Sequence, residues 1–456
     1  MRTPLVRGLL LCVLAAPAAA QGGTDTIPTS AAAASASAPG PTGLDTLTAR
    51  AVAVHPAVRA AAARVEAARA RIAPAGSWED PMLMAGLQNL PVSDPGFAGE
   101  MTMKMVGVGQ RVPFPGKTRL RRSAAERELA AAEAALDAAR LEAVQRVRDA
   151  YYELAYLDRA LEVTARSQQA LVALAATTQG RYAAGLAGQE DVLRARVEAA
   201  RMAEEAAALT EQRRTAQARL NEALDRPSET PVPPAAVPER IARAAVAASP
   251  AEVRFVSPAL GARAADSPLP QLRSLEETAV ARSPVLRERQ ARIDAQAARV
   301  ELARRDRLPD FDVSLQYGQR DGMPDMLSAT VSVPLPVQRG RRQDAFLAEA
   351  RADSAALEAE RHAERNRLRL EVARLHSEAE RARAQLALYV GSILPQGRAA
   401  VESATANYRA GRAGFEGVLE SQGTLFSYEI AHARLLSDFA RAVAELERVV
   451  GTEVLR

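Results

Sequence analysis

Two stretches of the chain place apolar or small residues at alternating steps of three and four, the repeat of a helix that buries one face. They run over about 189–226 and about 414–450, and their apolar positions keep the same phase relative to the turn before each stretch. Only Arg213 interrupts the first series. The pattern predicts two helices that each pack against a neighbour along a coiled-coil seam.

The turn before each of these helices is itself repeated. Arg181 to Leu193 reads RYAAGLAGQEDVL, and Asn407 to Leu419 reads NYRAGRAGFEGVL, 226 positions later. Each Gly-x-x-Gly core is expected to end a helix, because glycine adopts the left-handed conformation that closes a last turn. The sequence therefore predicts a tandem duplication of long helical hairpins whose tips lie at these two turns.

Two longer segments precede the turns and are predicted to be helical over about 117–184 and 341–410. The first has neither Gly nor Pro over most of its length, so about 60 helical residues would extend roughly 90 Å. The second contains Gly391 and Pro395. Proline removes a backbone hydrogen bond, and we therefore expect this helix to kink or break there.

We expect the two copies to span 44–226 and 271–452, each opening with a shorter helix. Helix breaks are predicted at His55-Pro56 and Ser283-Pro284, because proline fits the first turn of a helix and serine can cap it. Residues 227–270 are rich in proline and form the predicted joint between the copies.

Between the short and the long helix of each copy lies a candidate strand hairpin, at about 82–113 and about 310–335. In the second hairpin Phe311, Val313 and Leu315 alternate with polar residues, which predicts strands with one apolar and one polar face. Strands of about 9 to 11 residues can cross a bilayer at a tilt. A half-buried soluble sheet gives the same alternation.

The number of strands separates these alternatives. Two hairpins give four strands, whereas closed membrane barrels start at about eight strands and an open sheet edge cannot lie in hydrocarbon. Either the strands belong to a soluble sheet, or several copies of the chain each contribute four strands to one barrel.

The N-terminus favours the second alternative, because it predicts export. Residues 1–20 contain two arginines, an apolar run and small residues at the end, as a secretory signal peptide does. Cys12, the only cysteine, lies within them. We expect a mature chain from Gln21 without lipid or disulfide, followed by a flexible segment over 21–43.

Charge and candidate chemistry exclude several classes of function. Without the two arginines of the signal peptide, 57 basic residues face 55 acidic ones, so the charge gives no reason to expect nucleic-acid binding. The four histidines are dispersed, and no phosphate loop, nucleophile motif or Cys/His cluster occurs. We expect neither an enzyme nor a bound cofactor.

No metal site is predicted, but the first hairpin is rich in methionine. Thioether sulfur suits soft cations such as Cu(I), although methionine is also an ordinary packing or lipid-facing residue. The weak candidates are Met82, Met84, Met101, Met103 and Met105.

From about residue 44 to 452 the chain resembles the TolC-like outer-membrane efflux protein family. The resemblance rests on the repeated Tyr-x-x-Gly tips, the strand hairpin before each long helix, and Ile393-Leu-Pro395. Val112-Pro-Phe-Pro-Gly-Lys117 is similar to the CzcC- and CusC-like branch of heavy-metal efflux systems.

This resemblance implies a mainly α fold in which the duplicated helical hairpins form an α-barrel tunnel. Each chain would contribute four strands to a shared transmembrane β-barrel. It implies a homotrimer in the outer-membrane lipid that extends into the periplasm, with a periplasmic adaptor and an inner-membrane pump of the resistance-nodulation-division (RND) type as partners. The function would be passive conduction of substrates, heavy-metal cations among the candidates, to the exterior. The alternative is a secreted, soluble periplasmic coiled-coil scaffold.

The resemblance also implies sites. The residues expected to dock the adaptor lie in the two tips: Tyr182, Gly185, Leu186, Gly188, Tyr408, Gly411, Arg412 and Gly414. A tunnel constriction of acidic residues would match positions Gly417 and Glu420, so one expected acid is absent. Glu420 and Asp191 are the candidates for this constriction, although either also fits an ordinary acid on a helix surface or at a helix start.

Overall fold

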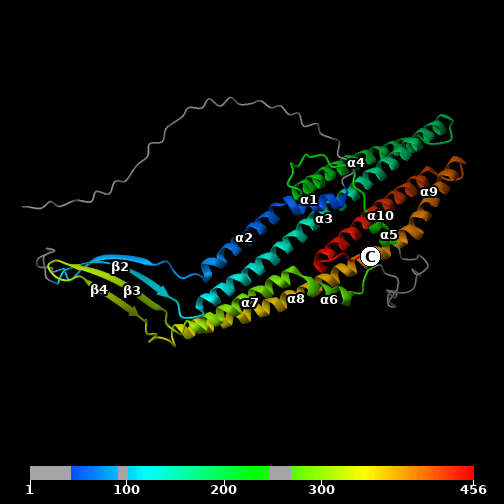
Figure 1. Ribbon diagram of the computed structural model, residues 1–456. Helices are drawn as coiled ribbons and strands as arrows, with labels where there is room; N and C mark the ends of the chain where they lie inside the picture. Colours follow the sequence, from blue (N-terminus) through cyan, green and yellow to red (C-terminus); the bar gives the residue numbers. More distant parts are fainter. Residues whose placement is uncertain (1–42, 91–100, 247–268, 456) are drawn as a thin grey trace, which may run out of the picture. The chain divides into compact units, whose positions relative to one another are not determined.

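The computed structural model describes residues 43–90, 101–246 and 269–455 (Figure 1). The expected signal peptide, almost all of the segment over 21–43 and the middle of the joint lie outside these residues, as does the loop of the first strand hairpin. The fold is mainly helical with four antiparallel strands, as predicted.

The first repeat contains four helices and two strands: α1 (Leu44–Val54), α2 (Pro56–Gly76), β1 (Met82–Gln88), β2 (Met103–Val112), α3 (Lys117–Ala183) and α4 (Gln189–Ala223). The joint contributes α5 (Glu239–Val246). The second repeat has the same order, with one helix interrupted: α6 (Leu272–Arg282), α7 (Pro284–Arg305), β3 (Phe311–Arg320), β4 (Met326–Ser332), α8 (Gln343–Leu388), a π-helical segment (Tyr389–Ile393), α9 (Leu394–Arg409) and α10 (Phe415–Val450).

The helices α2 and α7 begin in the same way. The Nδ1 atom of His55 accepts a hydrogen bond from the amide of Ala57 at 3.1 Å, and the Oγ of Ser283 accepts one from the amide of Leu286 at 3.3 Å. In both helices a proline occupies the first turn, where its missing N–H leaves no bond unmade. The predicted breaks are confirmed.

The π-helical segment interrupts the helical run at the place that Gly391 and Pro395 indicate. Pro395 is the second residue of α9 and follows this segment directly, so the missing N–H of proline falls where the regular α-helical bonding is already interrupted. The run is therefore not one α-helix over 341–410, and its counterpart α3 is continuous. The helix expected over 189–226 ends at Ala223, because Asp225 adopts a φ of +52° and Pro227 follows.

Buried apolar residues form a core where α3, α8 and α10 pack together. Tyr152, Val372 and Phe439 are among its fully buried side chains, and Ile241 of α5 packs into the same cluster. Beside it, the Arg213 guanidinium that interrupts the α4 seam pairs with Asp158 at 2.5 Å. The other oxygen of this carboxylate accepts a hydrogen bond from the amide of Ala235, so the pair ties the joint to α3.

The four strands form one sheet in the order β1-β2-β3-β4, with every pair antiparallel. Consequently β1 and β4 are its two edges. The register aligns Leu83 with Val108, Val108 with Leu315 and Leu315 with Ala329, so one face of the sheet is apolar. This face is open within one chain, where Leu83 is 77% exposed. No helix in the described part of the chain combines the length and hydropathy needed to cross a membrane.

Candidate functional site

The two predicted tips have nearly the same backbone. Gly185 and Gly411 adopt φ values of +74° and +71°, which confirms the expected left-handed turn. The amide of Leu186 donates to the carbonyl of Arg181 at 2.8 Å, and the amide of Arg412 donates to the carbonyl of Asn407 at 2.9 Å. These bonds satisfy carbonyls that the ends of α3 and α9 would leave unpaired.

The second glycine of each core has another role. Gly188 and Gly414 are extended, with φ values of −79° and −72°, and they precede α4 and α10. A Cβ added at Gly185 or Gly414 would meet no atom within 4 Å. The backbone of each tip is therefore open to the approach of another molecule.

Several of the expected docking residues are open to solvent. Leu186 is 65% exposed and Tyr182 is 43% exposed. Arg412 is exposed as well. Leu186, Tyr182 and Arg412 are therefore the accessible part of the tips.

Tyr408 differs from its repeat counterpart Tyr182, because it is only 3% exposed. It packs with Leu174 of α3 and Phe415 of α10, and its hydroxyl lies 3.2 Å from the Oγ1 of Thr178. Its place between the two hairpins means that it positions the tips relative to one another, whereas Tyr182 faces outward.

Arg181 is a tip residue that the candidate set leaves out. Its guanidinium donates to the carbonyls of Arg409 at 3.0 Å and Leu186 at 3.3 Å, and it lies over the ring of Tyr408, 4.8 Å from the centroid. A cation here also lies favourably near the carboxyl end of a helix. The sequence contained one signal for this residue: the two tips are similar, but the position of Arg181 is occupied by Asn407 in the second repeat. A difference within repeated turns marks a residue whose role the other tip does not repeat.

The two candidates for a constriction lie apart. Glu420 is exposed and lines a groove of about 310 Å³ together with Glu198, Glu416 and the apolar side chains Leu171 and Phe426. Asp191 is half-buried in the first turn of α4 and does not line this groove. The structure thus groups Glu420 with two carboxylates that sequence reasoning did not select.

The sheet places four of the five candidate methionines on one face: Met82, Met84, Met103 and Met105. Met101 precedes β2 and is 70% exposed. Among the described residues no group of three or more His, Cys, Asp or Glu side chains is placed to hold a metal ion.

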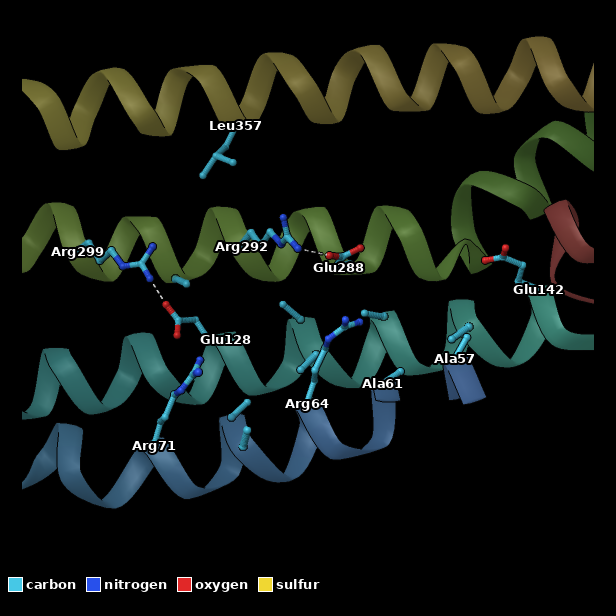
Figure 2. A pocket seen from close by; sticks show the side chains of 17 residues that line it. Ala57, Ala61, Arg64, Arg71, Glu128, Glu142, Glu288, Arg292, Arg299 and Leu357 are labelled. Carbon is cyan, nitrogen blue, oxygen red and sulfur yellow. Dashed lines mark hydrogen bonds and ion pairs between the residues drawn. The ribbon is translucent and has the colours of Figure 1, made fainter. Parts of the chain in front are cut away.

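A larger groove of about 910 Å³ lies between α2, α3 and α7 (Figure 2). Alanines of α3 form much of its lining, with arginines from α2 on one side and from α7 on the other. The α7 arginines are paired, Arg299 with Glu128 of α3 and Arg292 with Glu288. For Arg64 and Arg71 of α2, the described part of the chain offers no hydrogen bond or ion pair.

The Pro-Phe-Pro-Gly-Lys motif joins the two repeats at the start of the sheet. The Lys117 side chain is 4% exposed, and its Nζ donates to Asp310 and to the carbonyl of Leu308, both at 2.8 Å. Gly116 has a φ of +91°, and a Cβ there would collide with the guanidinium of Arg305. The motif therefore requires both the glycine and the lysine for packing.

The Asp310 carboxyl is held ionised by this contact. Partial burial raises its pKa, but the hydrogen bonds from Lys117 and from the amide of Phe114 outweigh that effect. The net pKa of Asp310 lies below its usual value. The ion pair thus links α3 of the first repeat to the start of β3 in the second.

Comparison with known proteins finds a relative that is named for metal resistance. The cobalt-zinc-cadmium resistance protein CzcC of Cupriavidus metallidurans is 27% identical over 186 residues, which cover 40% of this chain and 43% of that protein. The match thus spans less than half the length of this relative.

Solved structures share the fold. The outer membrane protein VceC of Vibrio cholerae has a TM-score of 0.72 at 21% identity, covering 90% of this chain and 96% of that one. The structure of CusC has a TM-score of 0.71 at 16% identity, covering 90% of this chain and 92% of that one. A model of the outer membrane efflux protein family matches residues 47–226 and 275–452. Because these matches cover most of the chain, one in each repeat, the chain belongs to the outer membrane efflux protein family.

Proposed function

We propose that three copies of the chain form an outer-membrane channel of a tripartite efflux system. The channel conducts substrates passively from a periplasmic adaptor and an inner-membrane RND-type pump to the exterior. Membership of the family supports the outer-membrane location and a channel in place of an enzyme. The name of the relative CzcC, a cobalt-zinc-cadmium resistance protein, supports heavy-metal cations as candidate substrates.

The observation that carries the proposal is the sheet with one open apolar face and two open edges. In the described chain β1 and β4 each pair on one side only, and Leu83, Leu315 and Val331 are exposed. Such edges and such a face are unfavourable in water and can be satisfied together when copies close the sheet into a barrel in lipid. A soluble scaffold would leave both exposed, and the family assignment does not favour that alternative.

The internal repeat supports assembly. The helices α7 and α3 form an ion pair within the chain, whereas the equivalent residues of their repeat counterparts, α2 and α8, do not. Arg299 follows Arg71 by 228 positions, and Asp353 follows Glu128 by 225. Arg299 of α7 pairs with Glu128 of α3. Neither Arg71 on α2 nor Asp353 on α8 has a hydrogen bond or ion pair to a described residue. We infer that Arg71 of one copy pairs with Asp353 of the next.

The tips are the proposed docking site for the adaptor. Tyr182, Leu186, Arg412 and the glycines Gly185 and Gly411 would form the contact surface, with Tyr408 holding the two hairpins together from within. Glu420 and Asp191 remain candidates for an acidic constriction at this end, and the carboxylates grouped around Glu420 favour it over Asp191.

Cysteine cross-linking tests the assembly, since the mature chain is expected to contain no cysteine. In the Arg71→Cys, Asp353→Cys variant, a short bis-maleimide should join different copies and give covalent dimers and trimers in denaturing gels. The matched variant Glu128→Cys, Arg299→Cys should be linked only within one copy. Intrachain links in the control without intermolecular products in the test variant would contradict the proposed contact.

Channel formation is tested separately on the purified protein. Trimers from the outer-membrane fraction should give stable conductance steps in a planar lipid bilayer. A monomer that stays soluble without detergent and gives no conductance would refute the channel.

A further inference from the structure

Every methionine that belongs to a strand lies on the face of the sheet opposite the apolar one. Met82 and Met84 of β1 lie on it with Met103 and Met105 of β2, and Met326 of β4 adds a fifth. Side chains alternate between the two faces of a strand, so this grouping follows directly from the observed register. Met326 lies in the second repeat of the same chain, so the methionine-rich first hairpin gave no reason to select it.

One row of the ladder shows how closely these residues are arranged. Gly86 pairs with Met105, Met105 with Gly318, and Gly318 with Met326. The row therefore alternates glycine and methionine across all four strands. No methionine is the direct cross-strand partner of another, so the nearest methionines on adjacent strands, Met84 and Met105, are diagonal neighbours, a relation that places Cβ atoms about 7–8 Å apart. In the adjacent rows, Met84 is the diagonal neighbour of Met105, and Met103 is the diagonal neighbour of Gly318.

Glycines provide the space into which the thioethers fold. A Cβ on Gly318 would lie 3.4 Å from the Sδ of Met103, and a Cβ on Gly109 would lie 3.8 Å from the Sδ of Met84. These two sulfur atoms thus lie over the backbone of the neighbouring strand. Met103 is thereby brought toward Met105 and Met326 on either side of Gly318.

The methionines match neither the apolar face of the sheet nor the polar residues that share their own face. The apolar face already provides the surface that lipid requires, so lipid does not explain five methionines on the other side. The remaining residues of that face include Gln316, Ser328 and Thr330, which are suited to water. Thioether sulfur is a soft, uncharged donor that selects soft monovalent cations over hard or borderline divalent ones.

Two arginines lie at the two ends of this face, Arg320 opposite Met103 in the register and Arg111 opposite Asp312. Arg320 belongs to the same face, but its guanidinium is turned to the β3–β4 turn, where it donates to the carbonyl of Pro324 at 2.7 and 3.0 Å. At the other end of the face, Arg111 is paired with Asp312 at 3.0 Å. Both guanidinium groups thus have oxygen partners.

We propose that the thioethers of Met82, Met84, Met103, Met105 and Met326 form a binding surface for soft monovalent cations of the Cu(I) and Ag(I) class. The surface deepens the proposed function, on which it rests, because in a closed channel this face lines the aqueous interior. Cations would bind to two or three sulfur atoms at a time and pass along the face.

Silver binding to the purified trimer tests the proposal. The test variant replaces the five methionines by leucine, which keeps an apolar side chain of similar size and removes the sulfur. The control variant replaces Met101, Met202 and Met323, which lie outside this surface. After equilibrium dialysis against limiting Ag(I), the five-leucine variant should retain roughly fivefold less silver than the wild type. The control variant should retain as much silver as the wild type.

X-ray absorption of the silver-loaded wild type should show sulfur neighbours. Equal silver binding by the wild type and the five-leucine variant would overturn the proposal. Trimer content and bilayer conductance are measured on the same samples, so failure of silver binding in a conducting trimer rejects the cation surface alone. Absence of trimers and conductance in the wild type rejects the channel.

Discussion

Replacing Lys117 by methionine removes the ammonium group that joins the start of α3 to the segment before β3. Its Nζ lies 2.8 Å from the carboxylate of Asp310, 2.8 Å from the carbonyl of Leu308 and 3.2 Å from the carboxylate of Asp306. Removing one partner of a buried ion pair costs about 3–5 kcal/mol. Because the Asp310 side chain is 25% exposed, water recovers part of this loss, and we expect a cost of roughly 3 kcal/mol.

The pH dependence gives an independent measure of the same contact. The pKa of Asp310 is lowered in the folded protein. Its contribution to stability is therefore present above the ordinary aspartate pKa of about 3.9 and is lost as the pH falls through the lowered value. In the Lys117→Met variant this loss at acidic pH should be smaller, because the ammonium no longer favours the carboxylate.

Urea unfolding of the detergent-solubilised protein, followed by circular dichroism, measures the free energy. Arg122→Met is the matched control, since Arg122 and Glu126 form an exposed pair for which we expect a loss of about 1 kcal/mol or less. A double-mutant cycle of Lys117→Met with Asp310→Asn should give a coupling energy of about 1.5–3 kcal/mol. A coupling energy near zero would refute the reasoning.

Three further predictions concern the helices. Tryptophan at both Gly185 and Gly411 should leave trimer yield near normal, since strain at each left-handed turn costs about 1–3 kcal/mol locally, but should abolish efflux-dependent resistance; resistance with intact trimers would exclude tip docking. Arg181→Gln should speed amide hydrogen exchange at both tips, and unchanged exchange would show that its guanidinium does not join them. Burial and nearby arginines lower the pKa of His432 below 6.5, so stability should fall as the pH drops from about 6.5 through that lowered value; thermal unfolding of His432→Leu between about pH 8 and pH 5 should lack this slope.

The sequence predicted the tips well as separate turns. Glycine is the residue that permits a φ near +70°, so Gly185 and Gly411 could be identified from local chemistry alone. The packing of the two hairpins against each other could not be predicted from local chemistry. Tyr182 and Tyr408 occupy the same place in the repeat, yet only Tyr408 is buried. A helical repeat reports the buried face of one helix, not which neighbouring hairpin covers it.

The faces of the strands were also predictable only in part from the sequence. Alternation predicted that the second hairpin has an apolar and a polar side, and the register confirms this. The sequence could not align Met326 with the methionines of the first hairpin, because that alignment depends on pairing between β2 and β3, which lie about 200 positions apart. In a hairpin the turn fixes the register, but no hairpin turn joins β2 to β3.

The π-helical segment Tyr389–Ile393 has a consequence for how the duplicated halves have diverged. Gly411 follows Gly185 by 226 positions, whereas the buried Val372 follows the buried Val147 by only 225. One extra residue has therefore entered the second half between core and tip, and the wide turn absorbs it. Without such a turn, one inserted residue would rotate every later side chain by about 100° around the helix axis. With it, the chain reaches Gly411 in the same left-handed conformation as Gly185. In the proposed assembly of three copies, the six tips would therefore keep similar backbones while two alternating kinds of helix lead to them.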